Sequence, residues 1–145
     1  MEKVREKIRN YLGSHPYLNL GTVTQEGTPV VHTLGFVSEG ATVYFMTDRT
    51  SRKAKNMMTN PAVAYTVDED EMRLGVIQGV QMEGNASLVD DEGEIQRVFG
   101  LMREKFPQVG EIPESPNYVI FKITPRVGYF LDNTVSFGHR ERVEY

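Results

Sequence analysis

The sequence predicts a mainly β protein: a six-stranded antiparallel barrel with peripheral helices. Two tight turns, at 25–29 and 38–40, separate short strand-like runs within about thirty residues, which is typical of an antiparallel meander. A long strand-like stretch at 74–89 contains glycines that favour sharp bends at barrel corners, namely Gly75, Gly79 and Gly84. With 145 residues, 39% of them hydrophobic, the chain can bury one core, so we predict one domain, 1–145.

Three segments have a helical pattern. Residues 2–12 repeat apolar side chains at helical spacing, and Gly13–Pro16 ends the helix. A second helix, at about 51–59, stops at Asn60, because the residue before a proline is disfavoured in the α region. The third begins at 90–92, where acidic side chains suit the positive end of the helix dipole. Its apolar stripe is Ile95, Val98, Phe99, Met102 and Phe106.

The six predicted strands alternate apolar and polar residues or are rich in β-branched and aromatic ones. They are 17–24, 30–37, 42–47, 62–67, 74–89 and 118–123, with 127–131 as a candidate continuation of the last. The acidic run 68–71 and the proline-rich stretch 107–116 are predicted to be loops. The barrel core is therefore placed at about 14–131, followed by a polar C-terminal arm, 132–145, without a clear period.

Composition excludes several classes of function. A net charge of −4 and a pI near 5.4 argue against a general nucleic-acid or anionic-membrane surface. The absence of cysteine excludes disulfides, thiolate metal sites and cysteine nucleophiles. The three histidines, at 15, 32 and 139, have no metal-ligand spacing. No run approaches the roughly 20 apolar residues of a membrane span, and the N-terminus lacks an apolar signal core, so a cytoplasmic location is expected.

The segment Val43–Asn60 contains the clearest candidate site. A strand ends at Met46 and Thr47, and Ser51-Arg52-Lys53 then opens a helix. Free backbone N–H groups and the positive end of the dipole favour an anion there. Cations at this end of a helix oppose the dipole, and an anionic ligand would remove that conflict. The alternative is an ordinary N-cap with two solvated cations. Neither a P-loop nor a Rossmann glycine pattern is present.

Two further segments are candidates for the same site. Alternation places His32, Leu34 and Phe36 on one face of their strand and Thr33, Gly35 and Val37 on the other. A glycine there would let a flat ligand or another backbone approach closely, whereas the alternative is a simple bend with a satisfied histidine. The tail around Phe137–Arg140 is either a frayed end or an ordered arm that places Arg140 near an anion. No catalytic motif is present, so a bound cofactor would carry any chemistry.

Taken together, these residues resemble the pyridoxamine 5'-phosphate oxidase-related FMN-binding split barrels, from about Tyr17 to Leu131. The specific part is TDRTSRKAKNMMTNPAVAYTV, with its strand-end Thr, its Ser-Arg-Lys and its Asn-Pro. The resemblance implies an FMN phosphate held by Arg52 and Lys53 and a homodimer with FMN at the subunit interface. The other implied FMN contacts are His32, Thr33, Leu34, Gly35, Phe36, Met46, Thr47, Ser51, Phe130 and Arg140.

The chain also departs from the oxidase proper. His32 stands where the oxidase has an arginine, and Val37 where it has a lysine for the substrate phosphate. The oxidase also has a glutamine on the long strand, which corresponds to a position near Gly79 and leaves Gln78 or Gln81 as stand-ins. The C-terminal Arg-Leu-His of the oxidase is not reproduced in this chain. We therefore predict a divergent FMN-dependent oxidoreductase acting on an unidentified small molecule. The alternatives are a non-catalytic FMN carrier or electron-transfer protein, or a barrel that binds a deazaflavin or haem.

Overall fold

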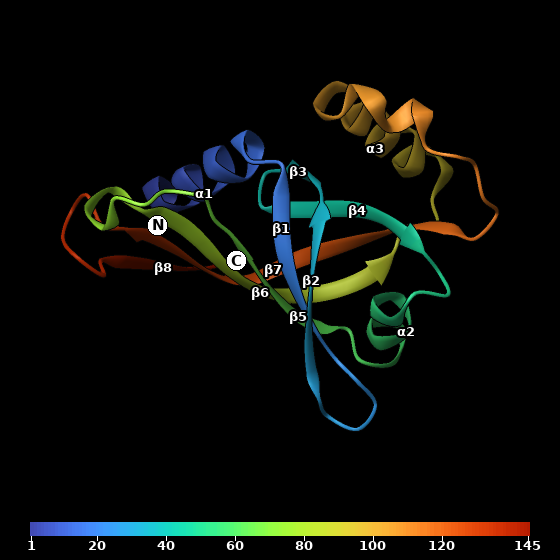
Figure 1. Ribbon diagram of the computed structural model, residues 1–145, viewed down its shortest axis with the longest axis horizontal. Helices are drawn as coiled ribbons and strands as arrows, with labels where there is room; N and C mark the ends of the chain where they lie inside the picture. The colour runs from blue at the N-terminus through green and yellow to red at the C-terminus, as the bar shows by residue number, and fades with distance from the viewer.

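The computed structural model describes residues 1–145 and contains one antiparallel sheet of eight strands with three α-helices (Figure 1). The strand order is β2-β1-β5-β6-β7-β4-β3, and β8 pairs with β7. The strands are β1 (Tyr17–Val23), β2 (Pro29–Gly35), β3 (Val37–Glu39), β4 (Thr42–Asp48), β5 (Ala62–Val67), β6 (Gln78–Leu88), β7 (Tyr118–Asp132) and β8 (Arg140–Glu144). The helices are α1 (Glu2–Ser14), α2 (Arg52–Thr59) and α3 (Glu92–Lys105), with short 3₁₀ segments η1 (Leu74–Val76) and η2 (Pro107–Glu111). No helix has the length and apolar composition needed to cross a bilayer.

The longest strand, β7, divides the sheet. All of β6 pairs with one edge of β7, and the register shifts between Glu83 and Gly84, which pair with Val127 and Pro125. The other edge of β7 is shared: residues 118–123 pair with β4, and residues 127–131 pair with β8. The two ends of β7 therefore lead to different parts of the molecule, as Figure 1 shows for the red and orange strand. This division is the structural basis of the split in the barrel.

Two apolar clusters stabilise the fold, one on each face of the sheet. The larger fills the barrel interior, where Leu18, Phe45 and Phe121 are buried and α1 contributes Ile8 and Leu12. The smaller lies between the outer face of β3, β4 and β7 and the apolar stripe of α3. Full burial of a Leu or Phe side chain contributes roughly 1.5–3 kcal/mol. Since α3 is held mainly by the smaller cluster, its position depends on side chains from three strands.

The predicted fold class is confirmed, with corrections to the strands. The barrel has eight strands where six were predicted. The run 30–37 is interrupted at Phe36, so that residues 37–39 form β3, and residues 74–76 are a 3₁₀ turn that precedes β6. The two pieces 118–123 and 127–131 form one strand, with a bulge in β7 next to Pro125: Gly84 pairs with Pro125 and Glu83 with Val127, so that Arg126 is the extra residue. The end of the arm is ordered: residues 140–144 form β8 against β7.

Candidate functional site

The N-terminus of α2 begins as the sequence predicts. Ser51 is the N-cap, and its Oγ accepts a hydrogen bond from the Ala54 N–H at 3.3 Å. The Thr47 hydroxyl, at the end of β4, lies 3.2 Å from the Ser51 hydroxyl. Thr47 is buried, whereas Ser51 is half-buried. Two hydroxyls and the first amides of the helix therefore converge at one point at the surface of the barrel.

Positive charge surrounds this point without an acidic partner. Arg52 and Lys53 occupy the first helical turn, which contains no acidic residue, and neither forms an ion pair with any carboxylate. The pKa of His32 is lowered, first by burial and then by the charges of Lys53 and Arg52. His32 Nδ1 is buried without a hydrogen-bond partner. We call His32, Thr47, Ser51, Arg52 and Lys53 the anion cluster. Its unpaired cations and donors fit a phosphate group.

Helix α2 is fixed to the barrel by a buried polar contact. Asn56 is buried and its side-chain amide donates to Thr22 Oγ1 on β1 at 3.1 Å. Ala54 and Met57, on the same side of the helix, are also buried. Because a buried hydrogen bond is costly to break on one side only, this contact holds the N-terminus of α2 in register with β1.

Two strand edges next to the anion cluster have free backbone groups. Strand β2 pairs only with β1, so its other edge is open. Strand β4 pairs with β3 only at residues 42–44, so the edge of residues 45–48 that faces away from β7 is also open. Unpaired N–H and C=O groups can bind the polar atoms of a ligand. The predicted backbone contacts at Thr33 and Gly35 lie on the first of these edges, and Met46 lies on the second.

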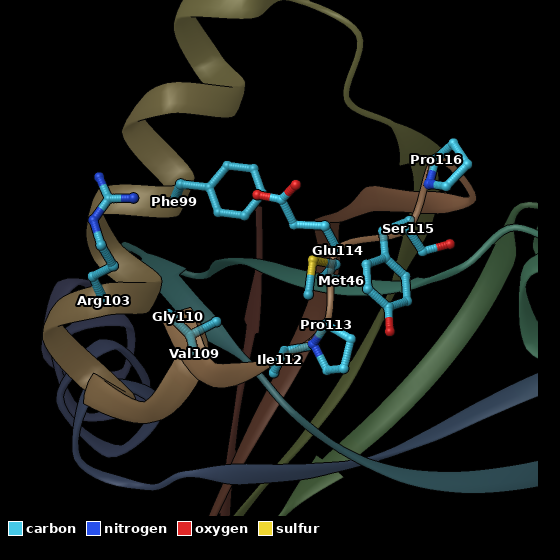
Figure 2. A pocket seen from close by; sticks show the side chains of 11 residues that line it. Met46, Phe99, Arg103, Val109, Gly110, Ile112, Pro113, Glu114, Ser115 and Pro116 are labelled. Carbon is cyan, nitrogen blue, oxygen red and sulfur yellow. The ribbon is translucent and has the colours of Figure 1, made fainter.

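A large cavity lies on the opposite face of β4 from Thr47, beneath α3 and the connection from α3 to β7 (Figure 2). One lobe has a volume of about 780 Å³ and a second, of about 350 Å³, shares Met46, Val109 and Ile112 with it. We call the two lobes the α3 cavity. Only Met46, Gly35 and Phe36 of its lining were predicted site residues. Two others, Tyr17 and Tyr118, begin β1 and β7, and the rest come from α3, its C-cap Phe106 and the stretch 107–116, which the sequence indicated only as an apolar stripe and a loop.

The residues that follow Leu34 in the chain are covered by α3. Leu34 packs against the barrel core, and Phe36 is buried with Lys105 Nζ 3.9 Å from its ring centroid. Burial lowers the pKa of Lys105 to about 8. A Cβ added to Gly35 would lie 3.3 Å from Cζ of Phe106. The flat group that approaches Gly35 in the structure is therefore the ring of Phe106, and Val37 is sealed behind α3 with 2% exposure.

The structure does not bring Phe130 and Arg140 to the anion cluster within one chain. Thr47 pairs with Val119, and Phe130 lies eleven residues further along β7, roughly 35 Å along a strand. Phe130 is 4% exposed and its ring packs edge-on against Tyr11, so it offers little surface to a ligand. Arg140 is exposed and pairs with Leu131. The predicted contacts of Phe130 and Arg140 with a cofactor stay predictions.

The two candidate glutamines lie apart. The Gln78 carbonyl accepts a hydrogen bond from the Tyr11 hydroxyl at 2.9 Å, at the end of the barrel that α1 covers. Gln81 lies in a shallow hollow on the outer face of the sheet, in register with Thr66 and Tyr129. Neither is near the anion cluster in the same chain, so the structure does not choose between them.

The fold is an antiparallel split barrel in which a cation-rich helix N-terminus lies beside two open strand edges. The family model described as pyridoxamine 5'-phosphate oxidase matches residues 4–132. The chain therefore belongs to the pyridoxamine 5'-phosphate oxidase family.

Relatives in this family have several described roles. HutZ of Vibrio cholerae, named a heme oxygenase, is 24% identical over 96% of this chain and 88% of its own. Its solved structure, described as a heme storage protein, has a TM-score of 0.72 at 23% identity and covers 85% of this chain and 90% of that one. General Stress Protein 26 from Bacillus anthracis has a TM-score of 0.73 at 25% identity over 97% of this chain and 98% of that one. ChuZ from Campylobacter jejuni, at 18% identity, has a TM-score of 0.83 over 99% of this chain and 60% of its own.

Proposed function

We propose that the chain binds FMN through the anion cluster and acts as an FMN-dependent oxidoreductase on a small molecule. The observation that carries the proposal is the set of unpaired groups at one point: two cations without carboxylate partners and the buried His32 Nδ1. A phosphate with negative charge and several acceptor oxygens would satisfy all three, together with the hydroxyls of Thr47 and Ser51.

In this proposal FMN, when bound, supplies the acceptor for a hydride or for electrons. The residues of this chain hold and orient it. Arg52 and Lys53 anchor the phosphate electrostatically and take no part in bond changes. The open edges of β2 and β4 offer backbone donors and acceptors to the polar atoms of the cofactor. No protein side chain near the cluster has the arrangement of a catalytic nucleophile or acid–base pair.

We propose a homodimer because one chain alone leaves the site incomplete. Arg140 belongs to the end of the molecule remote from the anion cluster, so only a second copy could place it there. A twofold axis would then bring the β8 end of each chain to the α2 end of the other. A monomer by light scattering at micromolar concentration, still holding FMN, would contradict this arrangement.

The test is the substitution Lys53→Ala, with Lys55→Ala on the same helix as the matched control. A charge-assisted contact to phosphate contributes roughly 1.5–3 kcal/mol, so we expect about 10- to 150-fold weaker FMN binding for Lys53→Ala. Lys55 is exposed and outside the cluster, and its substitution should change affinity less than twofold. The affinities are measured by flavin fluorescence on dilution. Equal retention of FMN by both variants would refute the assignment.

Haem is the second candidate, because HutZ is named a heme oxygenase and its structure is described as a heme storage protein. Haem propionates could take the place of phosphate at the two cations. Histidine is one side chain that could bind the haem iron. His15 is occupied, because its ring stacks on Tyr11 and its Nδ1 lies 2.7 Å from the Tyr11 carbonyl, whereas His32 Nδ1 has no hydrogen-bond partner and could serve. An absorption spectrum of the purified protein after titration with FMN and with haemin separates the two. Under our proposal FMN binds stoichiometrically and competes with haemin.

The carrier and deazaflavin alternatives are separated from the proposal by two further measurements. Mass spectrometry of the ligand released from the purified protein distinguishes FMN from a deazaflavin. Steady-state turnover with NADH or NADPH and a panel of electron acceptors tests for enzymatic activity. A flavin that is reduced by dithionite but supports no turnover with any acceptor would favour a carrier.

A further inference from the structure

The α3 cavity has an apolar and aromatic lining that the proposed cofactor site does not use. Phe99, Val109 and Ile112 line the larger lobe together with Met46 (Figure 2), and Tyr118 also belongs to its lining. The smaller lobe continues along β2, between Tyr17 and Phe106. The volume of each lobe falls within the range of pockets that bind small molecules, about 300–1,000 Å³.

The charges at the rim do not select an ion. Arg103 and Glu114 are the only charged residues of the lining, and both are exposed and without an ion-pair partner. Figure 2 shows the Arg103 side chain extending away from the other lining residues and the Glu114 side chain running toward Phe99. One charge of each sign at the edge leaves an apolar interior with no net charge. A phosphate or carboxylate moved into this interior would lose its hydration without a partner.

The side of the cavity next to β3 is also apolar. Val37 is 2% exposed and packs in one cluster with Val98 and Met102 of α3. No lysine lines either lobe. The cation beside this lobe, Lys105, is already engaged: its Nζ lies 3.9 Å from the Phe36 ring centroid and donates a hydrogen bond to the Leu12 carbonyl at 3.3 Å.

The cavity and the anion cluster are neighbours through β4. Met46 lines both lobes, and the next residue, Thr47, belongs to the anion cluster on the opposite face. Gly35 and Phe36, on the connection between β2 and β3, line the smaller lobe. A cofactor whose phosphate lies at the cluster and that follows the open edges of β2 and β4 would thus end beside this cavity.

Resting on the proposed function, we propose that the α3 cavity is the substrate site and that its substrates are uncharged, flat ring compounds. Aromatic side chains stack on such rings, and Met46 adapts to their shape. Because residues 107–116 supply much of the lining, they set which rings fit. Phosphorylated substrates are excluded by the same lining.

The experiment uses menadione as an uncharged ring probe and pyridoxamine 5'-phosphate as a charged comparator. Binding to the purified protein, with and without added FMN, is measured by equilibrium dialysis. The variant is Ile112→Glu, which places a charge in the lining shared by both lobes. The control is Leu88→Glu, because Leu88 has a similar exposure, 40% against 43% for Ile112, and lies outside the cavity. FMN affinity of each variant is measured in parallel.

We expect menadione to bind more tightly than pyridoxamine 5'-phosphate, with Ile112→Glu weakening menadione at least tenfold and Leu88→Glu changing it less than twofold. FMN affinity should be unchanged in both variants. Equal menadione binding by the two variants, or tighter binding of the phosphate, would overturn the substrate assignment. So would a parallel loss of FMN by Ile112→Glu, because the cavity would then hold the cofactor. If menadione binds as expected but FMN does not bind at all, the cavity assignment stands and the proposed cofactor fails.

Discussion

The anion cluster and the α3 cavity lie on opposite faces of the same strand, β4, and differ in how they are assembled. Four residues of the cluster fall within seven positions of the chain, from Thr47 to Lys53, and only His32 comes from elsewhere. The cavity combines β1, β2, β4, α3 and the connection to β7. The cluster is polar and organised by a helix terminus, whereas the cavity is apolar and organised by packing.

Because the two regions are assembled differently, we expect ligand binding at each of them to respond separately to substitution. Groups at a helix N-terminus bind through charge and hydrogen bonds, whose loss is local. The shape of an apolar cavity depends on every element around it. A substitution in the anion cluster should therefore leave binding in the α3 cavity unchanged, and a substitution in the cavity should leave binding at the cluster unchanged.

The largest effect is expected from Asn56→Ala, which removes the buried anchor of α2. The Thr22 hydroxyl would be left buried without its donor, which costs about 1–3 kcal/mol of unfolding free energy. The FMN affinity should fall as well, because α2 carries most of the cluster, whereas menadione binding should be unchanged. Urea denaturation and dialysis measure the three quantities, with Asn10→Ala on the exposed face of α1 as control. A loss of menadione binding equal to that of FMN would show that the regions are coupled.

Thr47→Val should have a smaller effect, confined to the cluster. The substitution keeps the shape of the side chain and removes the hydroxyl that lies 3.2 Å from Ser51 Oγ. The contact that is lost, between the Thr47 and Ser51 hydroxyls, is a neutral hydrogen bond that orients Ser51; such a bond contributes roughly 0.5–1.5 kcal/mol, so FMN should bind about 2- to 12-fold more weakly. Ser51→Ala provides the comparison, since it also removes the N-cap. An unchanged FMN affinity in Thr47→Val would exclude this hydroxyl from the site.

Gly35→Ala tests the cavity side with a still smaller change. Its Cβ would press on the Phe106 ring at 3.3 Å, so the ring must move by a few tenths of an ångström. Reduced freedom of the unfolded chain offsets part of that cost, and the net change in stability should stay below about 1 kcal/mol. Menadione affinity should change a few-fold and FMN affinity should not. A Phe106→Leu background should abolish the effect, and persistence of the effect there would locate its cause elsewhere.

The smallest effect concerns the protonation of His32. Burial and two neighbouring cations lower its pKa in the folded chain, so the neutral ring is favoured by folding. Its contribution to stability is therefore complete above the unfolded pKa of about 6.5 and is lost as the pH falls below it. A bound anion would offset the positive charges of Arg52 and Lys53, so it should raise the pKa of His32. An NMR titration with and without sulfate checks this, with His15 as internal reference, and equal shifts of both rings would refute it.

The sequence predicts the barrel because its turns and strand periods are local signals. It also predicts the anion cluster, whose residues are nearly contiguous. Strand β8 was not predicted, since in Arg140–Glu144 only Val143 is apolar and pairing with β7 decides the conformation. Strand β7 continues past Pro125 through a bulge of its own at Arg126, which the sequence does not indicate. The α3 cavity was also not predicted, because its lining residues come together through tertiary packing of α3 and residues 107–116.

The shared edge of β7 has a consequence for the order in which the chain can acquire its structure. Until residue 118 has left the ribosome, β4 has only the three-residue β3 as a partner and β6 has only β5. Strand β7 then joins β4, β6 and β8 and supplies Tyr118 to the cavity. During synthesis β4 and β6 therefore keep unpaired edges until β7 has emerged, and a stall before Tyr118 would leave these edges for chaperones to protect.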